Sequence, residues 1–167
     1  MARVDTDSIV TLSILDRLID NEPSNRNEAV LSRAQSVRTL KSALRRDLEW
    51  LLNTRRIADD ILDGYPDLAK SAYGFGLPDF TSFSFANVKD RARLLRALES
   101  AIRNFEPRLM AVRVVPLETQ SESGAKKLLR FQIEGLLRMD PAPERVSFDT
   151  VLQLTTGEYQ VKGDAGA

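Results

Sequence analysis

Hydrophobic residues recur every three to four positions over three stretches of the chain, and polar breakers separate these stretches. Such spacing places the apolar side chains on one side of an α-helix. The pattern predicts helices over residues 8–20, 36–53 and 87–105. The middle one is the clearest, with a stripe made of Val37, Leu40, Leu44, Leu48 and Leu51. Pro107 ends the last one, because a residue that precedes proline avoids the helical conformation.

Alternating apolar and polar residues follow the helices and indicate strands over residues 110–117, 128–139 and 146–155. In the second of these, Phe131 and Ile133 share one side, because side chains of a strand alternate between its two faces. Helices first and strands last predict an α+β fold. We expect N-terminal helices followed by a helix packed on a C-terminal antiparallel β-meander.

Breaks in the pattern divide the chain into three parts. Residues 1–34 form a predicted helical arm, because the polar Asn-Glu-Pro-Ser-Asn segment interrupts the chain after the first helix. Residues 35–157 form the predicted α+β domain, and residues 158–167 a small-residue tail that we expect to be flexible. The apolar stripe of the arm either folds onto its own domain or docks on a partner, and the linker favours the partner. The strand predicted over residues 146–155 is the last of the meander, so we expect it to be an edge of the sheet.

Composition limits the chemistry available to this chain of 167 residues. It contains no Cys, which excludes disulfides, thiol nucleophiles and Cys-ligated metals, and no His, which removes the commonest general base. This composition disfavours an enzyme. The chain shows neither an export signal nor an apolar run of membrane-spanning length, so we expect a cytoplasmic location.

The net charge is zero, but the charges are unevenly distributed. Residues 88–113 carry seven basic side chains against three acidic ones, whereas residues 1–28 carry six acidic against three basic. A nucleic-acid-binding module that uses the basic helix 88–105 is therefore one alternative. The sequence pI of about 6.4 and the lack of an aromatic stacking platform count against it.

Four sequence strings stand in an order that points to a family. They are Leu15-Asp16-Arg17-Leu18, the segment Asp47–Arg55, the loop Tyr73-Gly74-Phe75-Gly76-Leu77-Pro78-Asp79, and Ile102–Leu109 leading into Val112-Arg113-Val114. Together they resemble the TssE family of type VI secretion baseplate subunits, relatives of the phage tail baseplate wedge proteins of the GPW family. The resemblance covers roughly residues 15–154.

The resemblance implies a non-enzymatic part of a contractile injection machine. Such subunits bind other baseplate wedge subunits and offer a strand edge on which the contractile sheath begins to assemble. The resemblance implies no cofactor, metal, nucleic acid or small-molecule substrate, and contact with a membrane only through the assembled complex. It also places Asn53 and Arg55 in a central structural motif. We count both among the candidate partner-binding residues and favour support of the core over direct contact; the alternative is that each simply ends or stabilises a helix.

The segment Glu106-Pro107-Arg108 is the first candidate partner-binding site. Pro107 forces Glu106 out of the helix, and in an extended chain Glu106 and Arg108 project to one side. Either the strand phase then slips near Leu109, or both charges border a buried face. We hypothesise a polar latch at this corner that a group of a neighbouring subunit joins. The alternative is a solvated ion pair at the helix end.

The last predicted strand is the second candidate, because a sheet edge exposes backbone groups that can pair with an added strand. We expect the sheath to contact it at Val151, Gln153 and Thr155.

Two alternatives use carboxylates. A lysozyme-like glycan hydrolase needs a matched pair, yet no spacing pairs any two of Glu49, Asp79, Glu99 and Glu106. Asp59, Asp60 and Asp63 lie close together, but their spacing matches no calcium loop, and we expect a solvated helix end there.

Overall fold

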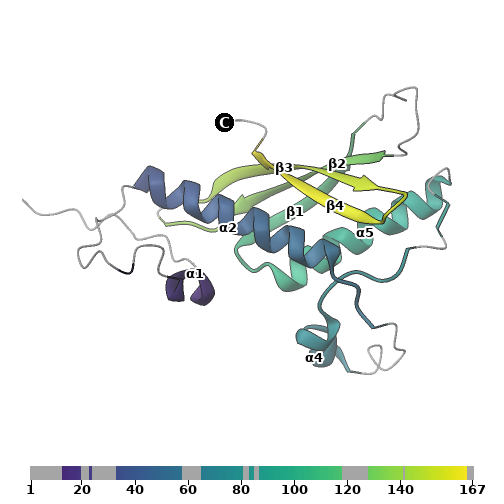
Figure 1. The fold of residues 1–167 in the computed structure, drawn as a ribbon, viewed down its shortest axis with the longest axis horizontal. Coiled ribbons are helices and arrows are strands. Elements are labelled where there is room, and N and C mark those ends of the chain that lie inside the picture. The colour runs from purple at the N-terminus through teal and green to yellow at the C-terminus, as the bar shows by residue number, and fades with distance from the viewer. Residues whose placement is uncertain are drawn as a thin grey trace, which may run out of the picture.

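The computed structural model describes residues 13–19, 23, 33–57, 65–80, 83–84, 87–117, 128–140 and 142–164. The helices precede the strands in the chain (Figure 1): α1 Ile14–Leu18, α2 Arg33–Asn53, α4 Pro66–Ala69, the 3₁₀ turn η1 Ala72–Gly74, α5 Val88–Phe105, β1 Leu109–Pro116, β2 Leu128–Leu137, β3 Glu144–Gln153 and β4 Glu158–Asp164. The predicted α+β order is confirmed.

The predicted helices agree closely with the structure. The helix predicted over 36–53 begins three residues earlier, at Arg33, and ends at Asn53 as expected. Asn87 starts α5, because its side chain accepts a hydrogen bond from the Lys89 backbone N–H at 3.0 Å. Of the helix predicted over 8–20, residues 14–18 are helical, and residues 8–12 and 20 lie outside the described part. Ser13 caps this helix, because its Oγ accepts from the backbone N–H of Asp16 at 3.1 Å.

The strands form one antiparallel meander in the order β1-β2-β3-β4. The β2–β3 ladder is regular, with Ile133 opposite Phe148. The alternation predicted for β2 is confirmed, since Phe131 and Ile133 are buried whereas Arg130 and Glu134 are exposed.

Strand β4 corrects two predictions. Residues 158–164 are not part of a flexible tail, and the predicted domain boundary at residue 157 is wrong. The strand predicted over 146–155 is not an edge, because β3 pairs with β2 on one side and β4 on the other. Gly157, at φ +72°, makes the tight turn, and its N–H donates to the Gln153 carbonyl at 2.8 Å. With only Tyr159 and Val161 buried, β4 has too few apolar positions to be recognised by alternation.

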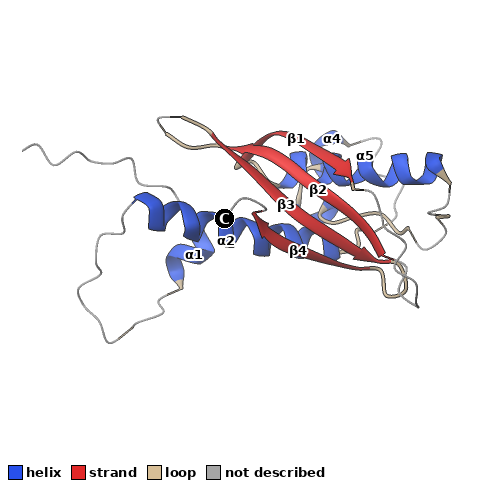
Figure 2. Cartoon of the chain, turned by 90° about the horizontal axis from the view of Figure 1, so that it is seen from above, coloured by secondary structure: helices blue, strands red, loops and turns tan. Residues whose placement is uncertain are grey.

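The molecule has two layers. Helices α2 and α5 lie on the same face of the sheet, α2 beside β4 and α5 beside β1, as Figures 1 and 2 show. The opposite face carries exposed polar residues such as Arg113, Arg130 and Glu134.

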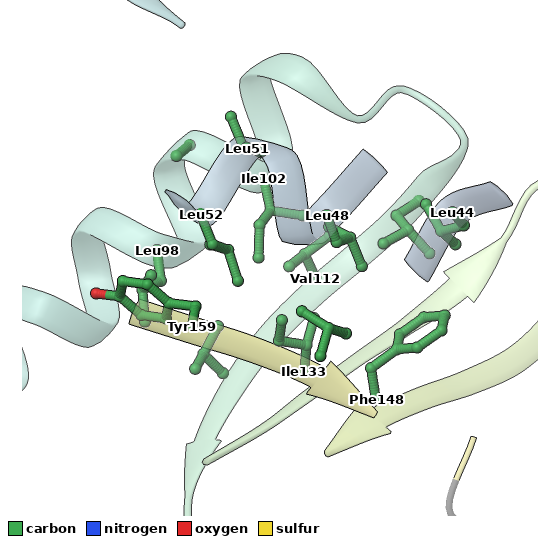
Figure 3. Close-up of a cluster of buried hydrophobic side chains, with 14 of the residues drawn as sticks. Leu44, Leu48, Leu51, Leu52, Leu98, Ile102, Val112, Ile133, Phe148 and Tyr159 are labelled. Carbon is green, nitrogen blue, oxygen red and sulfur yellow. The ribbon is translucent and has the colours of Figure 1, made fainter. Parts of the chain in front are cut away.

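The core lies between these layers, where leucines from the helices face aromatic and branched side chains from the sheet (Figure 3). Its fully buried members include Leu44, Leu48, Leu52, Leu94, Leu98, Ile102, Phe131, Ile133 and Phe148. Removal of these apolar side chains from water drives folding, and this core therefore fixes the positions of both helices over the sheet.

Strand β1 changes phase at its start. The register with β2 shifts between Met110 and Arg113, and Ala111 lies in the left-handed region at φ 52°. This bulge lets Leu109 and Val112, an odd number of residues apart, both be buried. The phase slip considered for this corner therefore occurs, centred on Ala111.

Candidate functional site

The corner between α5 and β1 is a tight turn. Glu106 ends the helix, its N–H donating to the Ile102 carbonyl at 2.8 Å, and its own carbonyl accepts from the Leu109 N–H at 3.1 Å. Pro107 displaces Glu106 from helical geometry as predicted, since Glu106 has φ −121° and ψ 79°. However, Pro107 and Arg108 form a turn rather than an extended segment.

The charges at this corner pair with each other and with α2. Arg108 Nε donates to Glu106 Oε1 at 2.6 Å and Nη2 donates to Glu106 Oε2 at 2.5 Å, which makes a bidentate pair. Arg108 Nη2 also lies 2.6 Å from Asp47 Oδ2 on α2. The third member of the latch is thus Asp47 of the same chain, where a group of a neighbouring subunit was expected.

The ionic contacts continue from Asp47 to α1. Arg46 donates to Asp47 Oδ1 through Nε at 3.0 Å, and its Nη1 donates to Asp16 Oδ1 at 2.8 Å. The hydrogen bond that Arg46 donates to Asp16, together with one from Ser13, holds the pKa of Asp16 below its ordinary value. Five side chains, Asp16, Arg46, Asp47, Arg108 and Glu106, therefore link α1, α2 and the α5–β1 corner; we call this set the ionic cluster.

Burial differs along the ionic cluster. The Glu106 side chain is 6% exposed and that of Arg108 21%, so the solvated alternative for this pair is wrong. The hydrogen bond with Glu106 raises the pKa of Arg108, although burial acts in the opposite direction, so the guanidinium stays charged. Arg108 Nη1 is buried and meets no hydrogen-bond partner among the described residues. The ionic cluster thus fixes the relative positions of α1, α2 and the α5–β1 corner.

Asn53 ties the end of α2 to β4. Its Nδ2 donates to the Tyr159 carbonyl at 2.9 Å, and its Oδ1 accepts from the Tyr159 N–H at 2.9 Å. The amide side chain therefore pairs with the outer backbone edge of β4 as a neighbouring strand would. Burial raises the pKa of the Tyr159 hydroxyl, whose ring packs against Phe131.

The loop Tyr73–Asp79 binds the segment that follows Asn53. The Leu77 N–H donates to the Thr54 carbonyl at 2.8 Å, and the Leu77 carbonyl accepts from the Arg56 N–H at 2.9 Å. Gly76 makes this approach possible, because its φ is +107° and a Cβ there would stand 2.4 Å from the Thr54 carbonyl oxygen. Two strings that are separate in the sequence are thus one structural unit.

The remaining predicted residues are scattered. Arg55 is 65% exposed, and its Nη1 lies 3.9 Å from Asp79 Oδ2. Val151 and Gln153 lie on β3 between two neighbours, and Thr155 is exposed in the β3–β4 turn. They therefore form no common site with the ionic cluster.

Sequence reasoning missed Asp47 and Tyr159. Asp47 stands on α2 between the buried Leu44 and Leu48, at the border of the apolar stripe. A carboxylate in such a place needs a cationic partner, and this was the available signal. Nothing local marks Tyr159 as the partner of Asn53.

Two of the four carboxylates considered for glycan hydrolysis, Glu99 and Glu106, have structural contacts. Glu99 Oε1 accepts from the Val114 N–H at 2.9 Å, and Glu106 binds Arg108. Over the described ranges, no group of three acidic side chains is placed to hold a metal ion, and no helix is both long and apolar enough to cross a membrane. Asp59, Asp60 and Asp63 lie outside these ranges.

One comparison with known proteins gives a match. A family model described as baseplate wedge protein gp25 matches residues 38–142, which is more than half of the chain. The match includes Asn53, Asp47, Glu106 and Arg108 and ends before β3 begins. No curated protein matches the chain.

Proposed function

The chain belongs to the baseplate wedge protein gp25 family, and on this basis we propose that it is a TssE-type subunit of a type VI secretion baseplate. In this proposal it joins other wedge subunits to the contractile sheath and helps to start sheath assembly in the cytoplasm. The family match, which contains most of α2 and the whole of α5, β1 and β2, is the observation that carries the proposal. The family is a structural one, and the ionic cluster supports the same role because it fixes shape.

The α5–β1 corner is the proposed contact with other wedge subunits. Pro107 is exposed at its tip, whereas Glu106 is buried beneath it and Arg108 binds both Glu106 and Asp47. In this proposal the partner contacts the surface around Pro107, and Glu106 and Arg108 hold that surface in shape. Asn53 supports a different place, the end of α2 beside β4, where it binds Tyr159, and Arg55 lies exposed two residues further along the chain.

The outer edge of β4 is the proposed contact with the sheath. At the other edge, the Val114 N–H is bound to Glu99 and Pro116 has no N–H, so β1 is a poor template for an added strand. On β4, Asn53 occupies the outer groups of Tyr159. Because outward groups alternate along a strand, those of Val161 are the next to face away from β3.

Deletion of the gene in the organism that encodes it tests the proposal. Cells with a fluorescent sheath subunit should lose extended sheaths, and the wild-type gene should restore them. The purified protein should release no fragments from peptidoglycan. Normal sheaths in the deleted strain, or glycan cleavage by the protein, would contradict a structural baseplate role.

A cysteine cross-link tests the β4 contact directly, because the natural chain contains no cysteine. Gln160→Cys puts a thiol on the exposed face of β4, and Ser42→Cys puts a matched thiol on the exposed side of α2. Across a strand pair, opposed Cβ atoms lie about 5 Å apart, within reach of a disulfide. A sheath subunit with cysteines along its terminal strands should cross-link to position 160 and not to 42. Equal cross-linking at both positions would reject the edge as the contact.

A further inference from the structure

One side of α5 carries a row of positive charge that neither the core nor the proposed contacts use. Lys89, Arg93, Arg96 and Arg103 are all exposed and follow one another at helical spacings of four, three and seven residues, with exposed Ser100 in the remaining position. This spacing puts them on one face of the helix, over about 21 Å of its length at about 1.5 Å per residue. We call these four residues the basic stripe.

Among the described residues, the acidic residues of α5 form no ion pair with the basic stripe. Asp90 Oδ2 accepts from the Ser84 N–H at 3.2 Å, and Glu99 Oε1 accepts from the Val114 N–H. Both carboxylates are thus bound to backbone N–H groups outside α5, one in the segment before the helix and one on β1. Within the described part of the chain, no residue of the stripe forms an ion pair; the Arg93 guanidinium lies 5.0 Å from the centre of the Phe83 ring, and Arg96 Nε donates to the Ala92 carbonyl of its own helix.

This arrangement does not stabilise the isolated domain. Like charges three or four positions apart on a helix repel each other, as in the pairs Lys89–Arg93 and Arg93–Arg96. The repulsion becomes attraction when carboxylates of a partner lie between these groups. Arginine suits such a contact, because its planar fork binds a carboxylate with two hydrogen bonds.

We propose that the basic stripe docks an acidic helix of another protein. A helix laid along α5 with carboxylates at alternating spacings of three and four residues would meet the stripe over its whole length. A nucleic acid fits less well, since none of the four stripe residues is aromatic and the Arg93 guanidinium already lies over the nearby Phe83 ring. The inference does not depend on the sheath contact, because the stripe is on α5 and the proposed edge is on β4.

A photo-cross-linker in place of Ser100 identifies what lies on the stripe. Ser100→p-benzoylphenylalanine puts the probe in the middle of the stripe, and the same replacement at exposed Ser42 on α2 is the control. In cells of the encoding organism, position 100 should capture a protein through a segment rich in Asp and Glu. Capture of nucleic acid, of a non-acidic segment, or of nothing beyond the Ser42 control would overturn the proposal.

Charge variants test whether the stripe causes the contact. The double variant Arg93→Glu/Arg96→Glu should lower the cross-linking yield at least about tenfold, because like charges would then face each other. Arg38→Glu/Arg45→Glu reverses two exposed charges on α2 and should leave the yield unchanged. Arg93→Gln/Arg96→Gln, which adds no repulsion, should give an intermediate loss if the reversed variant does not fold. An unchanged yield in a folded stripe variant would overturn the proposal.

Discussion

Arg108 Nη2 lies 2.6 Å from Asp47 Oδ2, although 61 positions separate the two residues in the chain. This contact joins the middle of α2 to the turn between α5 and β1, on the same guanidinium that holds Glu106. The orientation of the α5–β1 corner therefore depends on α2, which lies far before it in the chain. The shape of the surface around Pro107 therefore depends on the contacts of Arg108 with Glu106 and Asp47.

Arg108→Ala should strongly destabilise the protein, because it leaves the Glu106 carboxylate buried without its cation. We expect a loss of about 3–5 kcal/mol in the free energy of unfolding, measured by urea denaturation. The pair Glu106→Gln/Arg108→Ala should lose less than the sum of the two single variants, because neither charge remains. Additive losses would show that the bidentate pair has no energetic role.

Asn53→Ala should loosen β4 more than the rest of the sheet. It removes both hydrogen bonds to Tyr159, at a cost of about 1–3 kcal/mol. Amide hydrogen exchange should accelerate at Tyr159 and its neighbours on β4. Thr54→Val is a suitable control. Among the described residues, the Thr54 hydroxyl bonds only to the Trp50 carbonyl in the last turn of α2, and we expect a change within about 0.5 kcal/mol in the free energy of unfolding. Unchanged exchange on β4 in Asn53→Ala would contradict the clamp.

Replacing Ala111 by glycine and by valine should change the free energy of unfolding in opposite directions. Its φ of 52° suits glycine better than alanine. Ala111→Gly should stabilise the fold by up to about 1 kcal/mol, and Ala111→Val should destabilise it by about 1–2 kcal/mol, because a β-branched residue avoids positive φ. Thermal unfolding of both variants measures these effects. The reverse order of stabilities would be incompatible with the bulge at the start of β1.

Acid should release α1 from α2. The pKa of Asp16 is lowered, chiefly by its hydrogen bond from Arg46, so this contact stabilises the docked state at any pH above the ordinary carboxyl value of about 4. The stabilisation is lost as the pH falls through the lowered pKa, because Asp16 then becomes neutral. The protection factors of the amides of residues 14–18, which correct for the pH dependence of intrinsic exchange, should therefore fall as the pH drops below about 4. In Asp16→Asn these protection factors should already be low at neutral pH and should change little with acid. An acid transition retained in this variant would exclude Asp16 as its origin.

Local pattern determined a large part of this protein. The stripe Leu40–Leu51 determined both the existence of α2 and the side that it buries, and Asn53 as its last residue was predictable. The alternation of β2 and β3 set which residues face the core. Pro107 ended α5 for a reason that involves no more than its neighbours. The four strings, read together, also indicated the family that the match over residues 38–142 shows.

Tertiary structure decided the contacts between distant residues. Asn53 meets Tyr159 across 106 positions, and Asp47 meets Arg108 across 61. It also made β4 an edge strand and β3 an internal one, because Tyr159 and Val161 become a strand only when β3 and α2 lie beside them. The physical reason is that periodicity reports which side of an element is buried, since this depends on neighbours along the chain. Which groups meet across the core depends on how whole elements are placed, and that placement is settled when the layers pack.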